Sequence, residues 1–331
     1  MYSKVERDSQ MMELVLSAKA RSRTKYLANF SFTPPSMAIL ASDCVKLFDA
    51  AKHPVLRNYK KGEVTVYLRD VNISTVNGCD YLFLLLAISD KRRPDEVLSD
   101  PAADARRLIA KTGNEGSEYS CHIAIRTTPN KKGGNHYRAA FESVPSFGVY
   151  FVSSFLHHLF KLVSVAHGYS RPDPSGAMTA NAKQMVNIAV AVALNAVPSE
   201  ELLRDLRFGH MGEIELSREE EGVTGFDQSQ FTKRKKSTLV LVPTSVGLSN
   251  KVMDLVNAVC QTGGKKDFSI AKFSFTGSTG QQASVKFDCN TSSVLTDRYI
   301  KRKTFVFANP LPSSCDVLHQ EFCNELAMWA V

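Results

Sequence analysis

The sequence predicts an α+β protein of two domains, each with a mostly antiparallel sheet packed against helices. Strand-like runs with a two-residue alternation are separated by turn residues, and other stretches carry the spacing of amphipathic helices. The length of 331 residues suits two domains or one large one. A hydrophobic fraction of 44% and a charged fraction of 22% are ordinary for a globular chain, so a sizeable core is expected.

In the first half, the first 60 residues are expected to be mostly helical and irregular, with Ser36 beginning a helix that ends near residue 51. A strand is then expected at 63–70, where apolar and polar residues alternate, and another at 81–88, which is apolar throughout. The other elements expected in this half are a short helix at 105–110, a hairpin of strands at 119–127 and 136–143, and a helix at 148–166.

The main domain boundary is expected at 168–176, which contains two glycines and two prolines. The first domain would then be 1–170, with the basic excess and a polar-faced hairpin, and the second would be 177–331. The elements expected in the second half are helices at 179–196, after the N-cap Ser199, at 249–261 and at 315–329, and strands at 211–216, 238–242, 270–275, 283–288 and 298–307.

Composition favours a cytosolic protein that needs no membrane, metal or cofactor. The apolar runs are shorter than the roughly 20 residues that cross a bilayer, except for 148–166, whose His157, His158 and Lys161 favour a buried helix. The start of the sequence lacks the apolar core of a signal peptide. Seven cysteines without a Cys-x-x-Cys pair favour reduced thiols over a zinc site or a disulfide framework.

Several catalytic signatures are absent from the sequence. It contains no phosphate-binding loop of NTPases, no dinucleotide-binding glycine pattern, no nucleophile elbow and no His-Glu-x-x-His zinc helix. These absences argue against NTPases, hydrolases of the elbow type and zinc enzymes. Whether the chain is an enzyme of another kind stays open.

The net charge of +8 is concentrated in one half of the chain. Residues 1–175 hold 24 Lys and Arg against 17 Asp and Glu, a difference of +7, whereas residues 176–331 hold 17 against 16, a difference of +1. Such an excess is compatible with a nucleic-acid partner and equally with a solvated basic surface.

The hairpin at 119–143 offers the best candidate for a catalytic site. Alternation places His122 and Arg126 on one face of its first strand, and His136, Arg138 and Glu142 on one face of its second. If the apolar faces align, His122, Arg138 and Glu142 supply the proton acceptor, proton donor and charge stabilisation that metal-free phosphodiester cleavage needs. The same face also suits phosphate binding without cleavage, or ordinary cross-strand charge pairs in solvent.

Further basic side chains are candidates for contacts with a nucleic-acid backbone, because phosphate neutralisation supplies much of the affinity there. On the helix at 148–166, His157 and Lys161 share a polar stripe with Tyr150 and Ser153, although a helix side that faces solvent or the second domain gives the same pattern. The full set of candidates is Arg126, Lys131, Lys132, His136, His157, Lys161, Lys233, Arg234, Lys235, Lys236 and Arg302.

The stretch 118–160 resembles poorly characterised bacterial proteins of mobile elements and phage defence. In those proteins a strand with a His and alternating aliphatic residues leads into a Tyr-x-Ala-x-x-Glu strand, then a turn and an apolar helix. The matching residues here are His122-Ile-Ala-Ile125, Tyr137-Arg-Ala-Ala-Phe-Glu142 and Val144-Pro145. The likeness covers roughly one eighth of the chain and implies a defence or mobile-element setting rather than a mechanism.

These observations lead to three hypotheses. The first is an intracellular nucleic-acid-binding protein of bacterial antiphage defence or a mobile element, whose ligand is DNA or RNA. The second is a metal-independent nuclease built on His122, Arg138 and Glu142. The third is a non-catalytic interaction subunit of a defence complex, which binds a protein partner or a second copy through the apolar helix at 315–329.

Overall fold

The computed structural model describes residues 4–22, 27, 30–51, 54–144, 147–176, 178–179, 182–218, 237–243 and 252–331. The chain divides into two compact units, one made of Met1–Leu194 with Lys303–Val331 and the other of Asn195–Arg302. Helices and antiparallel sheets occur together in the described residues, so the predicted α+β class is confirmed.

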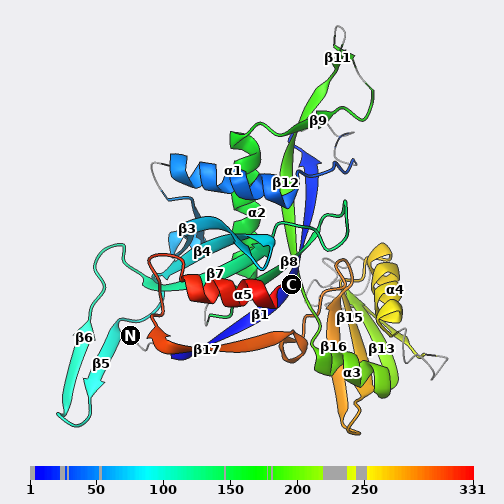
Figure 1. Ribbon diagram of the computed structural model, residues 1–331. Coiled ribbons are helices and arrows are strands. Elements are labelled where there is room, and N and C mark those ends of the chain that lie inside the picture. Colours follow the sequence, from blue (N-terminus) through cyan, green and yellow to red (C-terminus); the bar gives the residue numbers. More distant parts are fainter. Residues whose placement is uncertain are drawn as a thin grey trace, which may run out of the picture. The chain divides into compact units, whose positions relative to one another are not determined.

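The first unit is built on a nine-stranded sheet with the order β2-β3-β4-β7-β8-β1-β12-β9, in which β17 also pairs with β1 (Figure 1). Successive pairs from β2 to β8, the β1–β8 pair and the β9–β12 pair are antiparallel. The strands are β1 (Lys4–Ala20), β2 (Leu56–Tyr59), β3 (Val64–Val76), β4 (Cys79–Asp90), β7 (Ser117–Arg126), β8 (His136–Glu142), β9 (Ser170–Pro172), β12 (Met185–Ala196) and β17 (Arg302–Leu311).

Helices cover both faces of this sheet. On one side α1 (Met37–Ala50) and α2 (Val149–Ala166) pack against each other and against β3. On the other side α5 (Gln320–Trp329) packs against β7, β8 and β3. Because both faces are covered, β4 is apolar at consecutive positions rather than alternating, and residues 81–88 are all at most 1% exposed.

The layer under α5 is a compact apolar cluster. Tyr81, Phe83, Ala124 and Ala140 of the sheet pack against the aromatic residues of β17 and α5. The ring of Phe322 in α5 lies 5.9 Å from that of Phe305 and 5.2 Å from that of Phe307, both in β17. The last 29 residues therefore complete the core of a unit that begins at the other end of the chain.

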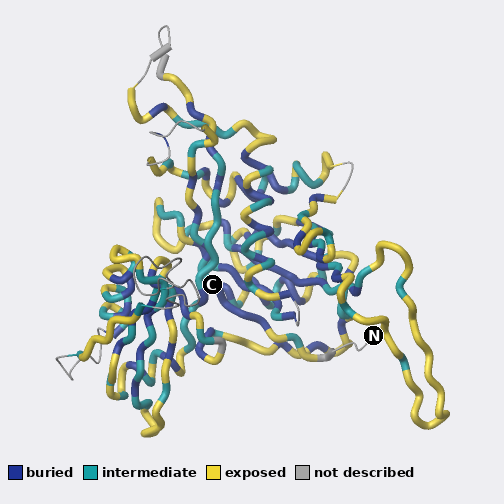
Figure 2. Tube along the Cα trace, turned by 180° about the vertical axis from the view of Figure 1, so that it is seen from behind, coloured by how far each residue is buried: buried dark blue, intermediate teal, exposed yellow. Residues whose placement is uncertain are grey.

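Two hairpins belong to separate two-stranded sheets. One pairs β5 (Glu96–Asp100) with β6 (Ala105–Ile109), and the other pairs β10 (Met178–Thr179) with β11 (Ala182–Lys183). Figure 2 shows that the β5–β6 hairpin is exposed along nearly its whole length, with Leu98 alone half-buried among its strand residues.

The described part of the second unit contains a four-stranded antiparallel sheet and two α-helices. Its strands have the order β14-β13-β15-β16, with β13 (His210–Arg218), β14 (Ser237–Leu241), β15 (Ile270–Thr276) and β16 (Gln282–Asp288). The helices are α3 (Glu200–Phe208) and α4 (Val252–Lys265). Phe273 and Phe287 are fully buried on one face, whereas Lys272, Ser274 and their neighbours form a polar opposite face, as strand alternation requires.

Helix ends and the hairpin follow the sequence prediction closely. Ser36 caps α1 by accepting a hydrogen bond from the Ile39 backbone N–H at 3.4 Å, and Ser199 caps α3 by accepting from Leu202 N–H at 3.1 Å. The predicted hairpin is present as β7 and β8. Four elements expected in the second half are present with shifted ends, namely β13, β14, β15 and β16.

Three predicted helical or irregular segments are strands instead. Residues 4–20, expected to be helical or irregular, form β1, in which Met12, Leu14, Leu16 and Ala18 are buried at every second position. Residues 105–109 form the exposed strand β6 rather than a helix. The expected helix at 179–196 is largely β12, because its alanines suggest a helix while Val186, Ile188 and Val190 bury one face of a strand.

The predicted boundary at 168–176 is also displaced. This stretch lies inside the first unit, because it contains β9, which pairs with β12 through Pro172 and Met185. The division between the units falls at residues 194–195, and the chain returns to the first unit at Lys303. Glycine and proline mark a turn here, but a turn within a sheet gives the same sequence signal as a linker.

Among the described helices, α2 is long and apolar enough to cross a membrane when judged only by length and composition. Its side chains Val152, Phe155, Leu159 and Phe160 are fully buried in the first unit. Core helices of this length meet the same criterion, so the finding is weak evidence for a membrane span.

We expect Phe322→Ala to lower the free energy of unfolding of the first unit by about 3–5 kcal/mol, because it leaves a cavity between α5 and β17. The fluorescence of the single tryptophan, Trp329 in the same helix, would report the urea midpoint. The control is Met328→Ala, since Met328 is 43% exposed and its loss should cost about 0.5 kcal/mol or less. An unchanged midpoint for Phe322→Ala would contradict the packing described above.

Candidate functional site

The hairpin face that carries the predicted catalytic residues lies inside the protein. Ile123 pairs with Phe141 and Ala124 with Ala140, and the same register places His122 opposite Glu142. The two side chains do share a face, as predicted. That face is covered by β17 and α5. The prediction of a solvent-exposed polar surface is therefore wrong at this end of the hairpin.

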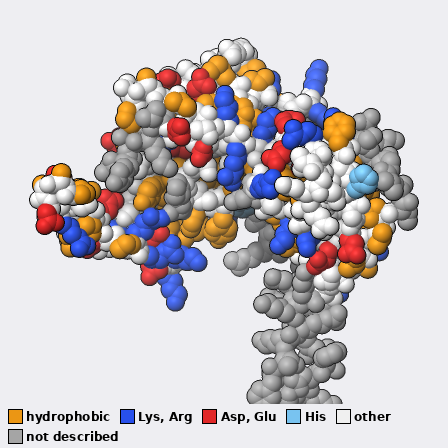
Figure 3. All heavy atoms as spheres, turned by 90° about the horizontal axis from the view of Figure 1, so that it is seen from below, with side chains coloured by type: hydrophobic (Ala, Val, Ile, Leu, Met, Phe, Trp, Pro, Cys, Tyr) orange, Lys and Arg blue, Asp and Glu red, His pale blue; other side chains and the backbone are white. Residues whose placement is uncertain are grey.

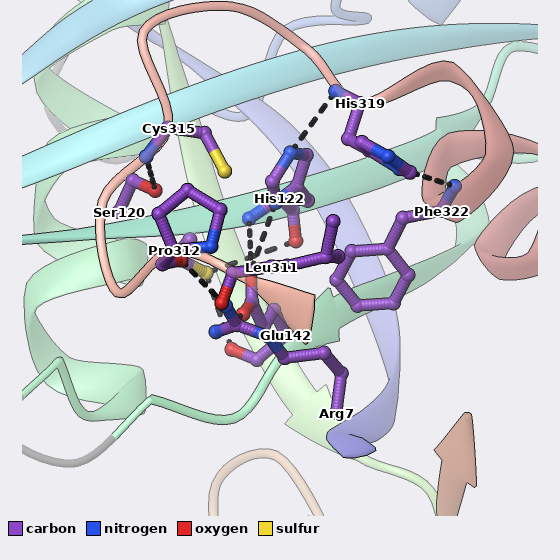
Figure 4. Close-up of polar contacts among 10 residues, drawn as sticks. Arg7, Ser120, His122, Glu142, Leu311, Pro312, Cys315, His319 and Phe322 are labelled. Carbon is purple, nitrogen blue, oxygen red and sulfur yellow. Dashed lines mark hydrogen bonds and ion pairs between the residues drawn. The ribbon is translucent and has the colours of Figure 1, made fainter. Parts of the chain in front are cut away.

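Glu142 is the centre of a buried polar network (Figure 4). Its Oε2 lies 2.8 Å from His122 Nδ1 and accepts from the His122 backbone N–H at 3.2 Å. Its Oε1 accepts from the Arg7 guanidinium at 2.7 Å. Arg7 also donates to the Leu311 and Pro312 carbonyls, and it comes from a segment that sequence patterns did not identify as a strand.

The hydrogen bonds of His122 define its protonation. Its Nε2 accepts from the His319 backbone N–H at 3.2 Å, so Nε2 carries no proton in this arrangement. The single ring proton is therefore on Nδ1, where it is donated to Glu142. His122 is a neutral imidazole that links a carboxylate to the N-terminal end of α5.

Side chains of the sheet hold residues 311–319 through further hydrogen bonds. Ser120 Oγ accepts from Cys315 N–H at 2.8 Å, and Asp70 Oδ2 accepts from Leu318 N–H at 2.9 Å. Beside them the Cys121 thiol donates to the Glu142 carbonyl at 3.2 Å, and burial raises the pKa of that thiol far above its ordinary value. The network thus fastens a loop and a helix to the sheet.

This geometry does not provide the groups of a nuclease. His122 and Glu142 are 1% and 2% exposed, and a substrate would have to displace residues 311–319 to reach them. Arg138 is four residues from Glu142, roughly 13 Å along β8, and lies opposite Glu13 of β1. Glu142 is neutralised by Arg7 instead, which is the interaction of a structural ion pair.

The apolar side of the C-terminal helix is also buried within the first unit. The predicted helix is present as α5, but Phe322, Cys323 and Leu326 are each at most 1% exposed in the first unit. Its apolar side is therefore already covered by this chain and is not offered to a partner protein.

A basic groove lies elsewhere in the first unit, and we define it by Lys19, Arg21, Arg57, His157 and Lys161. It consists of two hollows that share His157. One, of about 400 Å³, is lined by Lys19, Arg21 and Lys161 above Ala189 and Ala191 of β12. The other, of about 370 Å³, is lined by Arg57, Tyr150 and Ser153, with Val192 and Leu194 of β12.

Helix α2 brings the parts of the basic groove together. Ser164 Oγ accepts from Val190 N–H at 3.0 Å, and His157 Nδ1 accepts from Val192 N–H at 3.4 Å, so α2 is attached along β12. Arg57 of β2 donates to the Ser154 carbonyl of α2 at 2.6 Å. The small side chains Ala189 and Ala191 leave the space that forms the floor of the larger hollow.

The described lining of the basic groove carries an excess of cationic side chains. Neither hollow has a carboxylate among its described lining residues. The pKa of His157 is lowered from its ordinary 6.5 by burial and then by the neighbouring charges of Arg57, Lys161 and Lys19. A phosphate oxyanion placed here would meet several cationic side chains and the Nε2–H of a neutral His157.

None of the other predicted nucleic-acid contacts among the described residues lines either hollow. Arg126 donates to Thr128 Oγ1 at 2.8 Å, and His136 lies 3.2 Å from Glu13. Lys131 and Lys132 are exposed in the β7–β8 turn, and Arg302 is exposed at the start of β17. The run of Lys233, Arg234, Lys235 and Lys236 lies outside the described residues.

Sequence reasoning identified two members of the basic groove and missed three. His157 and Lys161 were found from the polar stripe on α2, whereas Lys19, Arg21 and Arg57 come from strands and a strand end far away in sequence. On the face drawn in Figure 3, Lys and Arg side chains are mixed with Asp and Glu, so net charge alone does not define an interface there.

Comparisons with known proteins add no assignment, because no family model, curated protein or solved structure matches this chain. In the described part of the chain, no group of three or more His, Cys, Asp or Glu side chains is placed to hold a metal ion.

We expect Glu142→Gln to lower the free energy of unfolding by about 3 kcal/mol or more, because Arg7 would remain buried without its counter-charge. The matched control is Glu13→Gln on the neighbouring strand, whose partly exposed pair with His136 should be worth about 1 kcal/mol or less. Urea unfolding followed by circular dichroism compares the two. Equal small effects would contradict the central role given to Glu142.

Proposed function

We propose that this protein binds nucleic acid through the basic groove. The observation that carries the proposal is the convergence of Lys19, Arg21, Arg57 and Lys161 around His157 without a carboxylate in the described lining. Charges of one sign repel one another, so their proximity is unfavourable, and an anionic ligand bound between them would offset this repulsion. A polyanion is favoured over a single anion because the cations line two adjoining hollows rather than one point.

Nucleic acid is the polyanion that suits this arrangement best. Arg and Lys neutralise successive phosphates, and the released counterions make such binding strong at low salt. The net charge of +8 adds long-range attraction for the same ligand. Backbone contacts of this kind carry little base information, so weak sequence preference is expected.

Other parts of the functional reading are proposals that rest on sequence patterns. They are a setting in bacterial phage defence or a mobile element, a cytosolic location, a division into two domains, and a protein partner or a second copy. Nuclease activity at His122, Arg138 and Glu142 has no geometric support, because the first and third of these residues are buried and tied to Arg7 and His319.

We expect nucleic-acid affinity to fall steeply with salt, and Lys161→Ala to weaken binding and to lower the slope of log K against log salt by about 0.7–0.9. Lys161 is an exposed side chain, so the variant should fold normally. Fluorescence anisotropy across a salt series measures both quantities. Lys91→Ala is the control, because Lys91 is also exposed but lines neither hollow. Equal effects of the two variants would contradict the proposed site.

We also expect affinity to rise as the pH falls between about 8 and 5, where histidines change charge. The pKa of His157 is lowered in the free protein, and bound phosphate would offset its three cationic neighbours and raise that pKa, so binding takes up a proton. In the free protein, by contrast, His157 should reduce the stability of the fold as the pH falls through 6.5. Its pKa is lower in the folded than in the unfolded chain, so the unfolded chain then binds more protons.

The test for this pH dependence is His157→Gln, which should flatten the affinity profile. His158→Gln is its matched control, since the pKa of His158 is lowered by burial and by Arg57 but His158 lines neither hollow. A profile that stays unchanged in His157→Gln would place the titrating group elsewhere.

A further inference from the structure

An aromatic side chain stands at the edge of the basic groove. Tyr150, in the first turn of α2, lines the hollow of about 370 Å³ together with Arg57 and is 70% exposed. Most of the surface of this ring is therefore open to contact by a ligand.

The ring of Tyr150 is held in place by other aromatic residues. It makes edge contacts with Tyr59, at a centroid distance of 6.4 Å, and with Phe151, at 5.5 Å. Tyr59 and Phe151 also contact each other edge-on, at 5.2 Å. A ring fixed by such contacts loses little further freedom when a ligand stacks on it.

Positive charge is fixed next to this aromatic group. The Arg57 guanidinium lies 5.2 Å from the centre of the Tyr59 ring and donates to the Ser154 carbonyl at 2.6 Å. The same hollow therefore presents a stacking surface and a phosphate-binding cation side by side. Alternating aromatic and cationic groups are how proteins hold single strands, whose bases are free to stack.

We propose that the basic groove takes single-stranded nucleic acid, with an unpaired base stacked on Tyr150, a neighbouring phosphate at Arg57 and a phosphate further along the strand at Lys161, which lines the second hollow. This inference rests on the proposed function and specifies its ligand. Each hollow has a volume suited to one small ligand, and hence to one nucleotide rather than to a double helix. In a duplex the bases are paired and stacked on one another, so Tyr150 would gain nothing from it.

The experiment compares labelled single-stranded DNA, single-stranded RNA and duplex DNA of equal length on the full chain, for the unaltered protein and for Tyr150→Ala, Tyr150→Phe and Lys161→Ala. Tyr150→Ala should weaken single-strand binding by about fivefold or more, which is the size of one lost stacking contact. Tyr150→Phe keeps the ring and should retain the affinity. Duplex binding should be weaker in the unaltered protein and unaffected by either change at Tyr150.

Photocrosslinking gives a second readout on the unaltered protein. A single strand that carries 5-iodouracil should attach to the peptide that contains Tyr150. The inference is overturned if duplex binds as tightly as single strands and Tyr150→Ala has no effect, while Lys161→Ala still weakens both. The proposed function itself fails separately, if none of the three nucleic acids binds at low salt. A single-strand preference for RNA or for DNA would identify which of the two the groove accepts.

Discussion

Glu142 places a carboxylate in the interior of the first unit, where an uncompensated charge would cost several kcal/mol. Arg7 of β1 and both N–H groups of His122 in β7 surround it, so donors from two neighbouring strands converge on one side chain of β8. A slip of β8 by one residue would turn Glu142 to the opposite face and leave Arg7 unpaired. The register of three strands is thus fixed by a charge as well as by apolar packing.

Strand β1 connects this buried network with the basic groove. Arg7 lies near one end of the strand and Lys19 near the other, and the twelve residue steps from one to the other correspond to roughly 40 Å of extended chain. The middle of the strand is buried between β8 and β12 in the sheet order. A rigid central strand therefore holds a cation at the groove, while α2, fastened to β12 by Ser164, supplies the opposite wall.

Local sequence patterns predicted the elements that are determined by residues close to one another in the sequence. The caps at Ser36 and Ser199 and the β7–β8 hairpin were predictable because neighbouring residues determine them. Strand β12 was not, because its alanines favour a helix locally and only the pairing with β1 and β9 decides otherwise. The pairing of His122 with Glu142 followed from alternation, but its burial depends on α5, nearly two hundred residues away in sequence. Lys19 and Arg57 carry no signal that would associate them before the chain is folded.

The order of the segments along the chain also affects how this protein is made. Residues 303–331 supply β17 and α5, yet they follow the whole of the second unit. At roughly 5–20 residues per second, the ribosome finishes the second unit while the sheet face with Tyr81 and Phe83 still lacks its cover. Neighbouring nascent chains on a polysome would thus expose this apolar sheet face to one another, which favours aggregation before synthesis is complete.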